Sequence, residues 1–484
     1  MGAKARSGLL WFTGLNLFQD LLQFATMLVL VRLLQPQTYG EFALVTSVLG
    51  FFTVFSFRSF LEHAFQVRAP EEPDYQTHFA AGGLIQLTVL LAMNAVALGM
   101  RRIPAYAPVA PAVHWISIYF LLDWGSELRV NMLERRMEWG RLRLLQATGL
   151  ALSAVTSVGL ALAGAGVYAL VLPQLWRFAP PLWDLLVTEG WRPTFQIDRA
   201  KYRRTWIYGW TRIGSGLAVR LQLLIEGTVM VGIVGFSSYG IYGRATGLAA
   251  MACLKLASLL TAALFPVLTR FTPATERYRQ ASGLVVRAVA WSAAPLAVIL
   301  GVLAVPVIRL LYGPKWLAVA EILPLALAVA ALGALSQSAS MLLLASKEQK
   351  KCLYADLTML SGSVLAIALA LPHGTTAYLG AMAAVNTVTL SQLLYWLWSA
   401  GNLSAEGIRQ ALVPPLLIAL LPAIVFTRMD FAMLTATVPR ALGTGLAMGV
   451  VYLLALRLGA AGPLKELMGQ MPGAAGFRRM FRFQ

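Results

Sequence analysis

Five basic side chains lie inside long apolar stretches of the sequence, where a charge is costly unless it meets water or a partner. Cations placed in this way could bind an anionic ligand as it crosses the same apolar layer. Arg220 and Lys255 fall near the middle of their stretches, too deep for the side chain to reach water at either end. We therefore expect a cationic binding cavity built from these two residues and from Arg58, Arg212 and Arg244.

Each of these cations could instead form one half of an internal ion pair. Arg58 precedes Glu62 by four residues, which is the spacing of a salt bridge along a helix. Arg244 and Lys255 are eleven residues apart and share one helix face, and either could pair with Glu226. Both interpretations stay open for these cations.

Acidic residues in the apolar stretches could bind a coupling ion, H+ or Na+, that drives a transport cycle. Asp20 and Glu226 are two candidates, and Asp20 lies among polar residues that share one helix face at their spacing, namely Asn16, Gln19 and Gln23. In the alternative interpretation, these polar side chains only hold neighbouring helices together.

A second acidic candidate is Asp123. It begins a stripe in which Asp123, Glu127 and Asn131 recur every four residues, so that all three share a helix face. The stripe could bind the coupling ion, or it could only balance the charges of Arg129, expected near the end of its span, and of Arg135, expected in the loop that follows.

Several kinds of chemistry find no support in the sequence. No glycine-rich loop ends in Lys-Ser or Lys-Thr, so we expect no direct use of ATP. The histidines are scattered, without cysteine or carboxylate at ligand spacing, so we expect neither a metal site nor any cofactor beyond a coupling ion. These histidines are His63, His78, His114 and His373.

The composition indicates the elements that must hold these side chains. Of 484 residues, 58% are hydrophobic and 12% are charged, whereas soluble domains have about 25% charged residues. Mean hydropathy is +0.69. Since apolar segments longer than a globular core needs recur throughout, we predict an all-α integral membrane protein.

About fourteen apolar segments are long enough to cross a bilayer core of about 30 Å. The predicted spans are 8–31, 40–60, 79–100, 112–133, 144–165, 167–188, 206–234, 239–268, 283–311, 318–345, 352–371, 377–399, 410–427 and 439–458. The loops predicted outside the cytoplasm are too short for a catalytic domain, which disfavours a membrane enzyme such as a glycan polymerase.

The basic residues that connect the spans predict their orientation. The net charge of +18 gathers in the connections, where Lys and Arg face the cytoplasm, so it does not indicate nucleic-acid binding. One alternate set of loops carries most of these residues, which places both termini in the cytoplasm. The first span has no cleavage site after it and is expected to remain as an anchor.

An internal repeat joins the two halves of the chain. The turn 33–42 contains Tyr39-Gly40, and the turn 233–242 contains Tyr239-Gly240 about 200 residues later, at the matching place in its hairpin. We predict two repeated six-helix lobes over residues 1–200 and 201–400, followed over 401–484 by two helices and a basic tail. Such duplication places a substrate site between the lobes, near the middle of the membrane.

Three segments carry a family resemblance. They are Leu30–Leu44, which contains Arg32-Leu33-Leu34-Gln35-Pro36; Gly235–Gly247 with Phe265–Arg270; and Leu310–Trp316. In matching order over roughly residues 1–400, they resemble the polysaccharide transporter (Wzx-type) branch of the multidrug/oligosaccharidyl-lipid/polysaccharide flippase superfamily. Gln35 stands where that family generally has Gly, so the resemblance leaves the geometry of the first turn open.

The resemblance implies a two-lobed bundle that alternates between inward-open and outward-open forms in a bacterial inner membrane. Its ligand would be a glycan on undecaprenyl pyrophosphate, used for O-antigen, capsule or exopolysaccharide. Membrane lipid, a polysaccharide polymerase and glycosyltransferases would be its partners.

The alternative is a cation-coupled exporter of amphipathic small molecules, similar to the MATE transporters, in which a span-one Asp such as Asp20 is associated with coupling. An anionic glycolipid calls for a basic cavity, whereas cationic drugs call for an acidic or neutral one.

Overall fold

The computed structural model describes residues 3–66, 73–195, 197–268, 271–427 and 438–459, and every regular element in these ranges is helical. The predicted all-α class is confirmed. By their internal contacts the residues form two compact units, Met1–Gly240 and Ile241–Gln484.

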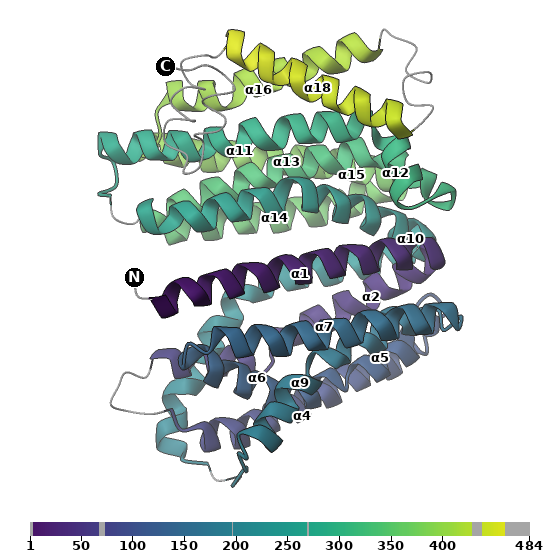
Figure 1. Ribbon diagram of the computed structural model, residues 1–484, viewed down its shortest axis with the longest axis vertical. Coiled ribbons are helices and arrows are strands. Elements are labelled where there is room, and N and C mark those ends of the chain that lie inside the picture. The colour runs from purple at the N-terminus through teal and green to yellow at the C-terminus, as the bar shows by residue number, and fades with distance from the viewer. Residues whose placement is uncertain (1–2, 67–72, 196, 269–270, 428–437, 460–484) are drawn as a thin grey trace. The chain divides into compact units, whose positions relative to one another are not determined.

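The N-terminal unit is a bundle of long helices interrupted by short helical turns (Figure 1). Within it α1 packs on α7, and α6 packs on α4 and α9. Its elements are α1 (Ala3–Leu33), α2 (Pro36–Thr53), α3 (Arg58–Leu61), η1 (Glu62–Gln66), α4 (Tyr75–Met100), η2 (Ala107–Val109), α5 (Ala110–Ile116), α6 (Tyr119–Arg135), α7 (Trp139–Leu162), α8 (Tyr168–Val171), η3 (Leu172–Arg177), α9 (Ala179–Trp183), η4 (Asp184–Thr188) and the first part of α10 (Arg199–Leu268).

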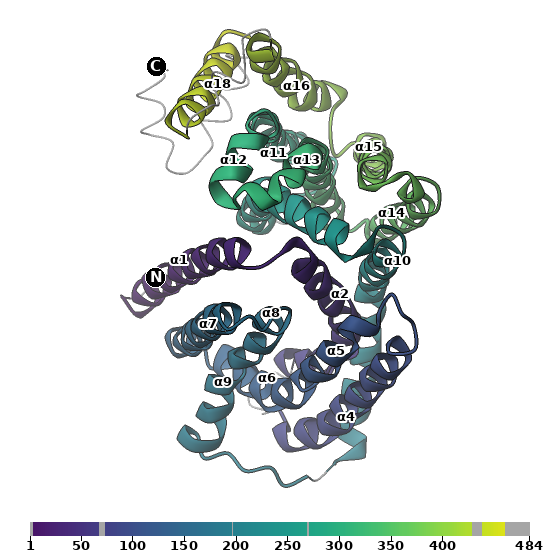
Figure 2. The same cartoon turned by 90° about the vertical axis from the view of Figure 1, so that its right-hand side faces the viewer.

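The C-terminal unit contains the rest of α10 and packs α11 against α13 and α16, while α14 and α15 lie side by side (Figure 2). Trp316, from the third family-like segment, is fully buried in it. Its further elements are α11 (Glu276–Val302), α12 (Ala304–Leu311), η5 (Pro314–Trp316), α13 (Leu317–Ala345), α14 (Gln349–Leu369), η6 (Leu371–His373), α15 (Thr375–Ser399), α16 (Ala405–Thr427) and α18 (Val438–Gly459).

Among the described residues, 8 helices are long and apolar enough to cross a membrane. They are Pro36–Ala64, Tyr75–Met100, Trp139–Leu162, Val219–Leu259, Glu276–Val302, Pro314–Ala345, Gln349–Leu369 and Thr375–Ser399. The count of fourteen stays a prediction, because several expected spans are not single helices. The span 167–188, for example, is divided among α8, η3, α9 and η4, and Pro173, Pro180 and Pro181 stand in these short elements and cannot donate a backbone hydrogen bond.

The two repeated turns break the helix at matching positions but in different ways. Gln35 separates α1 from α2 with an extended backbone, φ −90° and ψ 157°. Gly235 interrupts α10 with φ 80° and ψ 170°, a conformation that only glycine adopts without strain. The predicted spans 206–234 and 239–268 are therefore the two parts of α10.

The Tyr-Gly pairs of the repeat form a close and reciprocal helix contact inside the N-terminal unit. A methyl group on Gly40 would overlap the backbone carbonyl of Phe236, and one on Gly240 would overlap the carbonyl of Pro36. Neither backbone can retreat without moving its helix. The matching glycines thus allow α2 and α10 to cross at backbone distance, as small residues do in membrane helices.

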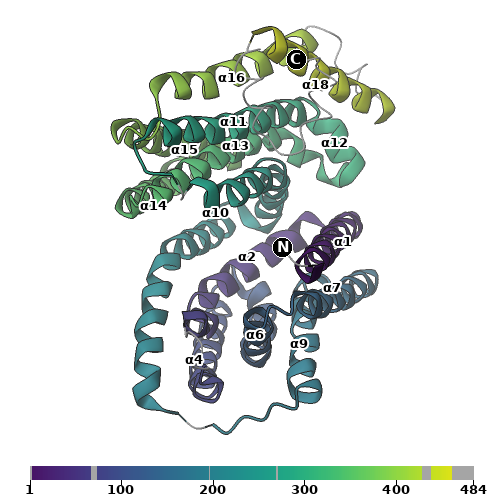
Figure 3. The ribbon, with the colours of Figure 1, turned by 60° about the vertical axis from the view of Figure 1, so that its left-hand side comes forward.

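The first part of α10 packs within the N-terminal unit. Trp206 stacks on Phe60 with ring centroids 5.4 Å apart, and the Tyr106 hydroxyl donates to the Thr228 carbonyl at 3.0 Å. Figure 3 shows this part of α10 running beside α4. These contacts continue across the predicted lobe boundary at residue 200. The assignment of 201–240 to a second lobe stays a prediction.

We predict that Gly40→Ala and Gly240→Ala each destabilise the protein by about 1–3 kcal/mol or more, because the new methyl group meets rigid backbone. Thermal unfolding of the purified protein in detergent measures the change. Gly247→Ala is the matched control, since its Cβ would meet nothing within 4 Å and alanine favours the helix. Equal unfolding temperatures for all three variants would contradict the reciprocal contact.

Candidate functional site

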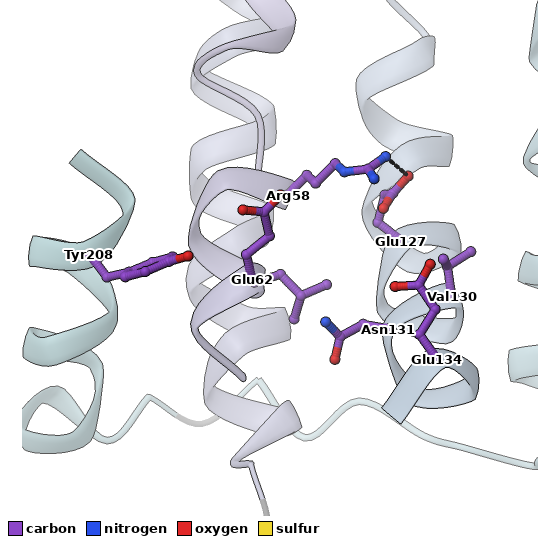
Figure 4. Close-up of a pocket in the computed structure, with 8 residues that line it drawn as sticks. Arg58, Glu62, Glu127, Val130, Asn131, Glu134 and Tyr208 are labelled. Carbon is purple, nitrogen blue, oxygen red and sulfur yellow. Dashed lines mark hydrogen bonds and ion pairs between the residues drawn. The ribbon is translucent and has the colours of Figure 1, made fainter. Parts of the chain in front are cut away.

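A polar cavity of about 320 Å³ lies in the N-terminal unit, between α3, η1, α6 and the first part of α10 (Figure 4). Its charged lining consists of three glutamates and one arginine. The lining residues are Arg58, Leu61, Glu62, Glu127, Val130, Asn131, Glu134 and Tyr208. The cavity therefore offers acceptors for hydroxyl groups, together with a single cation.

Helix α6 presents the predicted acidic stripe on one buried face. Asp123, Glu127 and Asn131 are only 2%, 9% and 4% exposed. Each is contacted from another element: Gln86 Nε2 donates to Asp123 Oδ2 at 3.0 Å, and the Tyr75 hydroxyl donates to Asn131 Oδ1 at 3.3 Å. The predicted common face is confirmed. Glu127 and Asn131 reach the cavity, and Asp123 lies one turn deeper.

Arg58 is the cation of the cavity, and its side chain is 58% exposed. Its Nη1 lies 3.4 Å from Glu127 Oε1, a contact across 69 residues of sequence that Figure 4 marks with a dashed line. The sequence had suggested Glu62, one helical turn away. Helix α3 ends at Leu61, however, and Glu62 starts the 3-10 helix η1, so the regular i+4 geometry does not hold.

Other predicted cations lie on α10, outside this cavity. Arg220 is exposed, and its guanidinium reaches Gly50 on α2. In the C-terminal unit Lys255 is exposed and Arg244 half-buried. The side chain of Arg212 lies outside the described part of the chain.

The remaining acidic candidates do not line the cavity either. Asp20 is exposed on α1, and Glu226 is buried on α10, 8% exposed. Of the residues predicted to form a cationic site, the described cavity lining thus includes only Arg58, while Glu127 of the acidic stripe is its partner.

Sequence reasoning missed a buried ion network around Arg129. This side chain is 0% exposed, and its Nε and Nη1 lie 2.6 Å from Asp184 and 2.8 Å from Glu189. Arg141 also pairs with Asp184 at 2.7 Å, and Arg136 with Glu189 at 2.9 Å. The hydrogen bond from Arg136 holds the pKa of Glu189 below its usual value, so that carboxylate stabilises the fold at neutral pH and loses this effect as the pH falls through its lowered pKa.

Arg129, expected near the end of a span, is fully buried in the protein. Its ion pairs go to Asp184 and Glu189, which lie outside the acidic stripe. Residues two apart on a helix point in nearly opposite directions, so Arg129 and Glu127 face different neighbours. The acidic end of the broken span at Asp184 was the signal that could have identified the partner.

An apolar groove of about 700 Å³ lies on the other side of α3, between α2, α4 and α10. Phe60 lines the groove, whereas its neighbours Arg58 and Leu61 line the polar cavity. Trp206 and Trp210 of α10 also line the groove and contact Phe60. The polar cavity and the apolar groove thus lie on either side of the single turn α3. This arrangement suits an amphipathic molecule.

Comparisons with known proteins agree with this architecture. The profile of the family described as "Polysaccharide biosynthesis protein" matches residues 29–321. The succinoglycan biosynthesis transport protein ExoT of Rhizobium meliloti (strain 1021) is 24% identical over 296 residues. That match spans 61% of this chain and 60% of the length of ExoT.

Two solved structures share the fold. A structure named "Lipid II flippase MurJ, inward closed conformation" superposes with a TM-score of 0.70 at 12% identity, covering 94% of this chain and 99% of the other. An inward-facing MATE family multidrug transporter of the MOP superfamily gives 0.58 at 13% identity, covering 85% and 96%. The predicted MATE-like fold class is therefore confirmed.

We predict that Arg129→Met destabilises the protein by about 3–5 kcal/mol, because two carboxylates lose a buried partner. Thermal unfolding in detergent is the measurement. The double variant Arg129→Met with Asp184→Asn should recover part of the loss, since one uncompensated charge is removed. Arg409→Ala is the control, because its ion pair with Glu406 is exposed. An Arg129→Met protein as stable as the wild type would contradict a buried network.

Proposed function

Because the chain belongs to the polysaccharide biosynthesis protein family of the multidrug/oligosaccharidyl-lipid/polysaccharide superfamily, we propose that it is a flippase for a lipid-linked oligosaccharide. The observation that carries the proposal is the family match over residues 29–321, which includes every residue of the polar cavity. The substrate we propose is a glycan on undecaprenyl pyrophosphate, moved from the cytoplasmic to the outer leaflet of a bacterial inner membrane.

The protein is a multi-pass membrane protein, and its relatives are transporters by name, in agreement with the expectation that it is no enzyme. The inner membrane, the cytoplasmic position of both termini and the alternation of two lobes are parts of the proposal. A polymerase and glycosyltransferases of the same pathway would consume and supply the glycan.

The proposed substrate matches the compartments on either side of α3. A pyrophosphate carries about two negative charges, and Arg58 is exposed to the cavity with an ion pair of 3.4 Å that such a group can replace. Asn131, Tyr208 and the glutamates can accept or donate hydrogen bonds to sugar hydroxyls. The apolar groove beside Phe60 suits part of the lipid chain.

One observation favours a second function, the cation-coupled export of amphipathic molecules. The cavity has three glutamates and one arginine, an acidic balance that suits a cationic ligand. A drug-resistance phenotype on expression that is lost in Asp20→Asn would support this function.

We predict that Arg58→Ala lowers surface glycan production at least about tenfold, since hydrogen bonds to charged groups contribute about 1.5–3 kcal/mol. The measurement is the glycan on cells that lack the chromosomal gene and carry the variant, with immunoblots showing that the protein reaches the membrane. Arg409→Ala, whose exposed ion pair lies far along the chain in α16, should leave glycan production unchanged. Arg220→Ala and Lys255→Ala test the other two predicted cations in the same assay.

If Arg58→Ala cells make normal amounts of glycan, the cavity does not bind the head group. If deletion of the gene itself leaves all surface glycans intact and instead sensitises cells to cationic drugs, the export function replaces the flippase.

A further inference from the structure

Asp123 is buried on α6, and no cation among the described residues lies at contact distance from it. It is 2% exposed, and in the part of the chain that the structure describes its one hydrogen bond comes from Gln86 Nε2, at 3.0 Å. The nearest ion pair, that of Arg58, goes to Glu127. A carboxylate removed from water with a single neutral donor is costly.

Gln86, on α4, supplies an independent observation. Its side chain is 0% exposed, and its Oε1 has no hydrogen-bond partner among the described residues. An unsatisfied buried acceptor also costs about 1–3 kcal/mol. The amide that carries this acceptor is the one that already donates to Asp123.

One proton satisfies both groups. A neutral carboxyl has an O–H donor in addition to its acceptor oxygen, and an amide has a donor and an acceptor side by side. If Asp123 carries a proton, Gln86 Nε2 donates to Oδ2 while the carboxyl O–H donates to Gln86 Oε1. The two side chains then form a cyclic pair with no buried charge and no orphaned acceptor.

We propose that the Asp123–Gln86 pair is a proton-binding site that takes up and releases one proton during transport. The charged groups that act on Asp123 are Glu127 on its own helix, Arg58 on α3 and Arg177 on η3. Tyr119, also on α6, is the remaining titratable neighbour. The two arginines favour release of the proton, and Glu127 and the burial oppose it.

Glu127 connects the proton site to the cavity, because it lies one helical turn from Asp123 and pairs with Arg58. This step rests on the proposed function. When a pyrophosphate binds Arg58, Glu127 loses its cationic partner. Glu127 then binds a proton more readily than it does in the ion pair. It therefore takes up a proton, from Asp123 or from water in the cavity, and the proton returns when the pyrophosphate leaves, while no other bond changes.

Infrared difference spectroscopy of the purified full chain in nanodiscs tests the proton site without any substrate. At neutral pH the wild type should show a protonated carboxyl stretch that is lost in Asp123→Asn. In Gln86→Leu the band should move to higher frequency, because the carboxyl loses its acceptor. Glu406→Gln is the control, since Glu406 is exposed and its ion pair with Arg409 lowers its pKa. A spectrum in which neither Asp123→Asn nor Gln86→Leu changes a carboxyl band overturns the site.

Vesicles that contain undecaprenyl pyrophosphate test the coupling. A phosphatase outside the vesicles reports each lipid that reaches the outer leaflet, and a pH gradient is imposed in either direction. We expect the wild-type rate to change at least fivefold with the gradient, on the order of 1 kcal/mol, and the Asp123→Asn rate to be independent of it. Wild-type flipping that ignores the gradient overturns the coupling and leaves the flippase intact. Absence of wild-type flipping contradicts the proposed function, and the infrared result still decides the proton site.

Discussion

The backbone contact between Gly40 and Gly240 determines where α10 can lie, and much of the site depends on it. Each glycine faces a carbonyl of the other turn, Phe236 or Pro36, so the two repeated motifs approach as closely as backbones allow. This crossing holds the first part of α10 against the N-terminal unit. There it supplies Tyr208 to the polar cavity and Trp206 to the apolar groove. The repeated Tyr-Gly pair is thus a packing requirement, and the polar residues of the site lie elsewhere.

A second constraint is the division of the buried charges between two faces of α6. On one face Arg129 is held by Asp184 and Glu189, each of which also pairs with another arginine, so each carboxylate of that network has two cationic partners. On the other face, among the described residues, Glu127 has only the 3.4 Å contact with Arg58, and Asp123 has only the hydrogen bond from Gln86. A charge that already has close partners gains little binding energy from a ligand, whereas a charge with few partners gains more. The face with Asp123 and Glu127 is therefore the one suited to bind a ligand or a proton.

Patterns along one helix could be predicted from the sequence, and contacts between helices could not. The period of four placed Asp123 and Glu127 on one face, and the matched Tyr-Gly turns marked the repeat. The partners Arg58 for Glu127 and Gln86 for Asp123 are separated from them by 69 and 37 residues, and no spacing rule connects them. The i+4 rule failed for Arg58 and Glu62 because α3 is a single turn. The burial of Arg129 could not be predicted, because prolines break the span that carries its partner into short elements with no regular helical spacing.

Protons bound to the carboxylates would allow the acidic cavity to bind an anionic ligand. With every group ionised, Glu62, Glu127 and Glu134 outweigh Arg58, so a pyrophosphate would enter a lining of its own sign. Like charges in a medium of low dielectric constant repel strongly, and each proton bound by a carboxylate removes one such repulsion. Binding of an anion at Arg58 and uptake of protons by the stripe therefore favour each other, and by linkage each raises the affinity for the other. The proposed proton site beside the cavity would thus favour an anionic substrate, whereas a cationic substrate would need the stripe ionised.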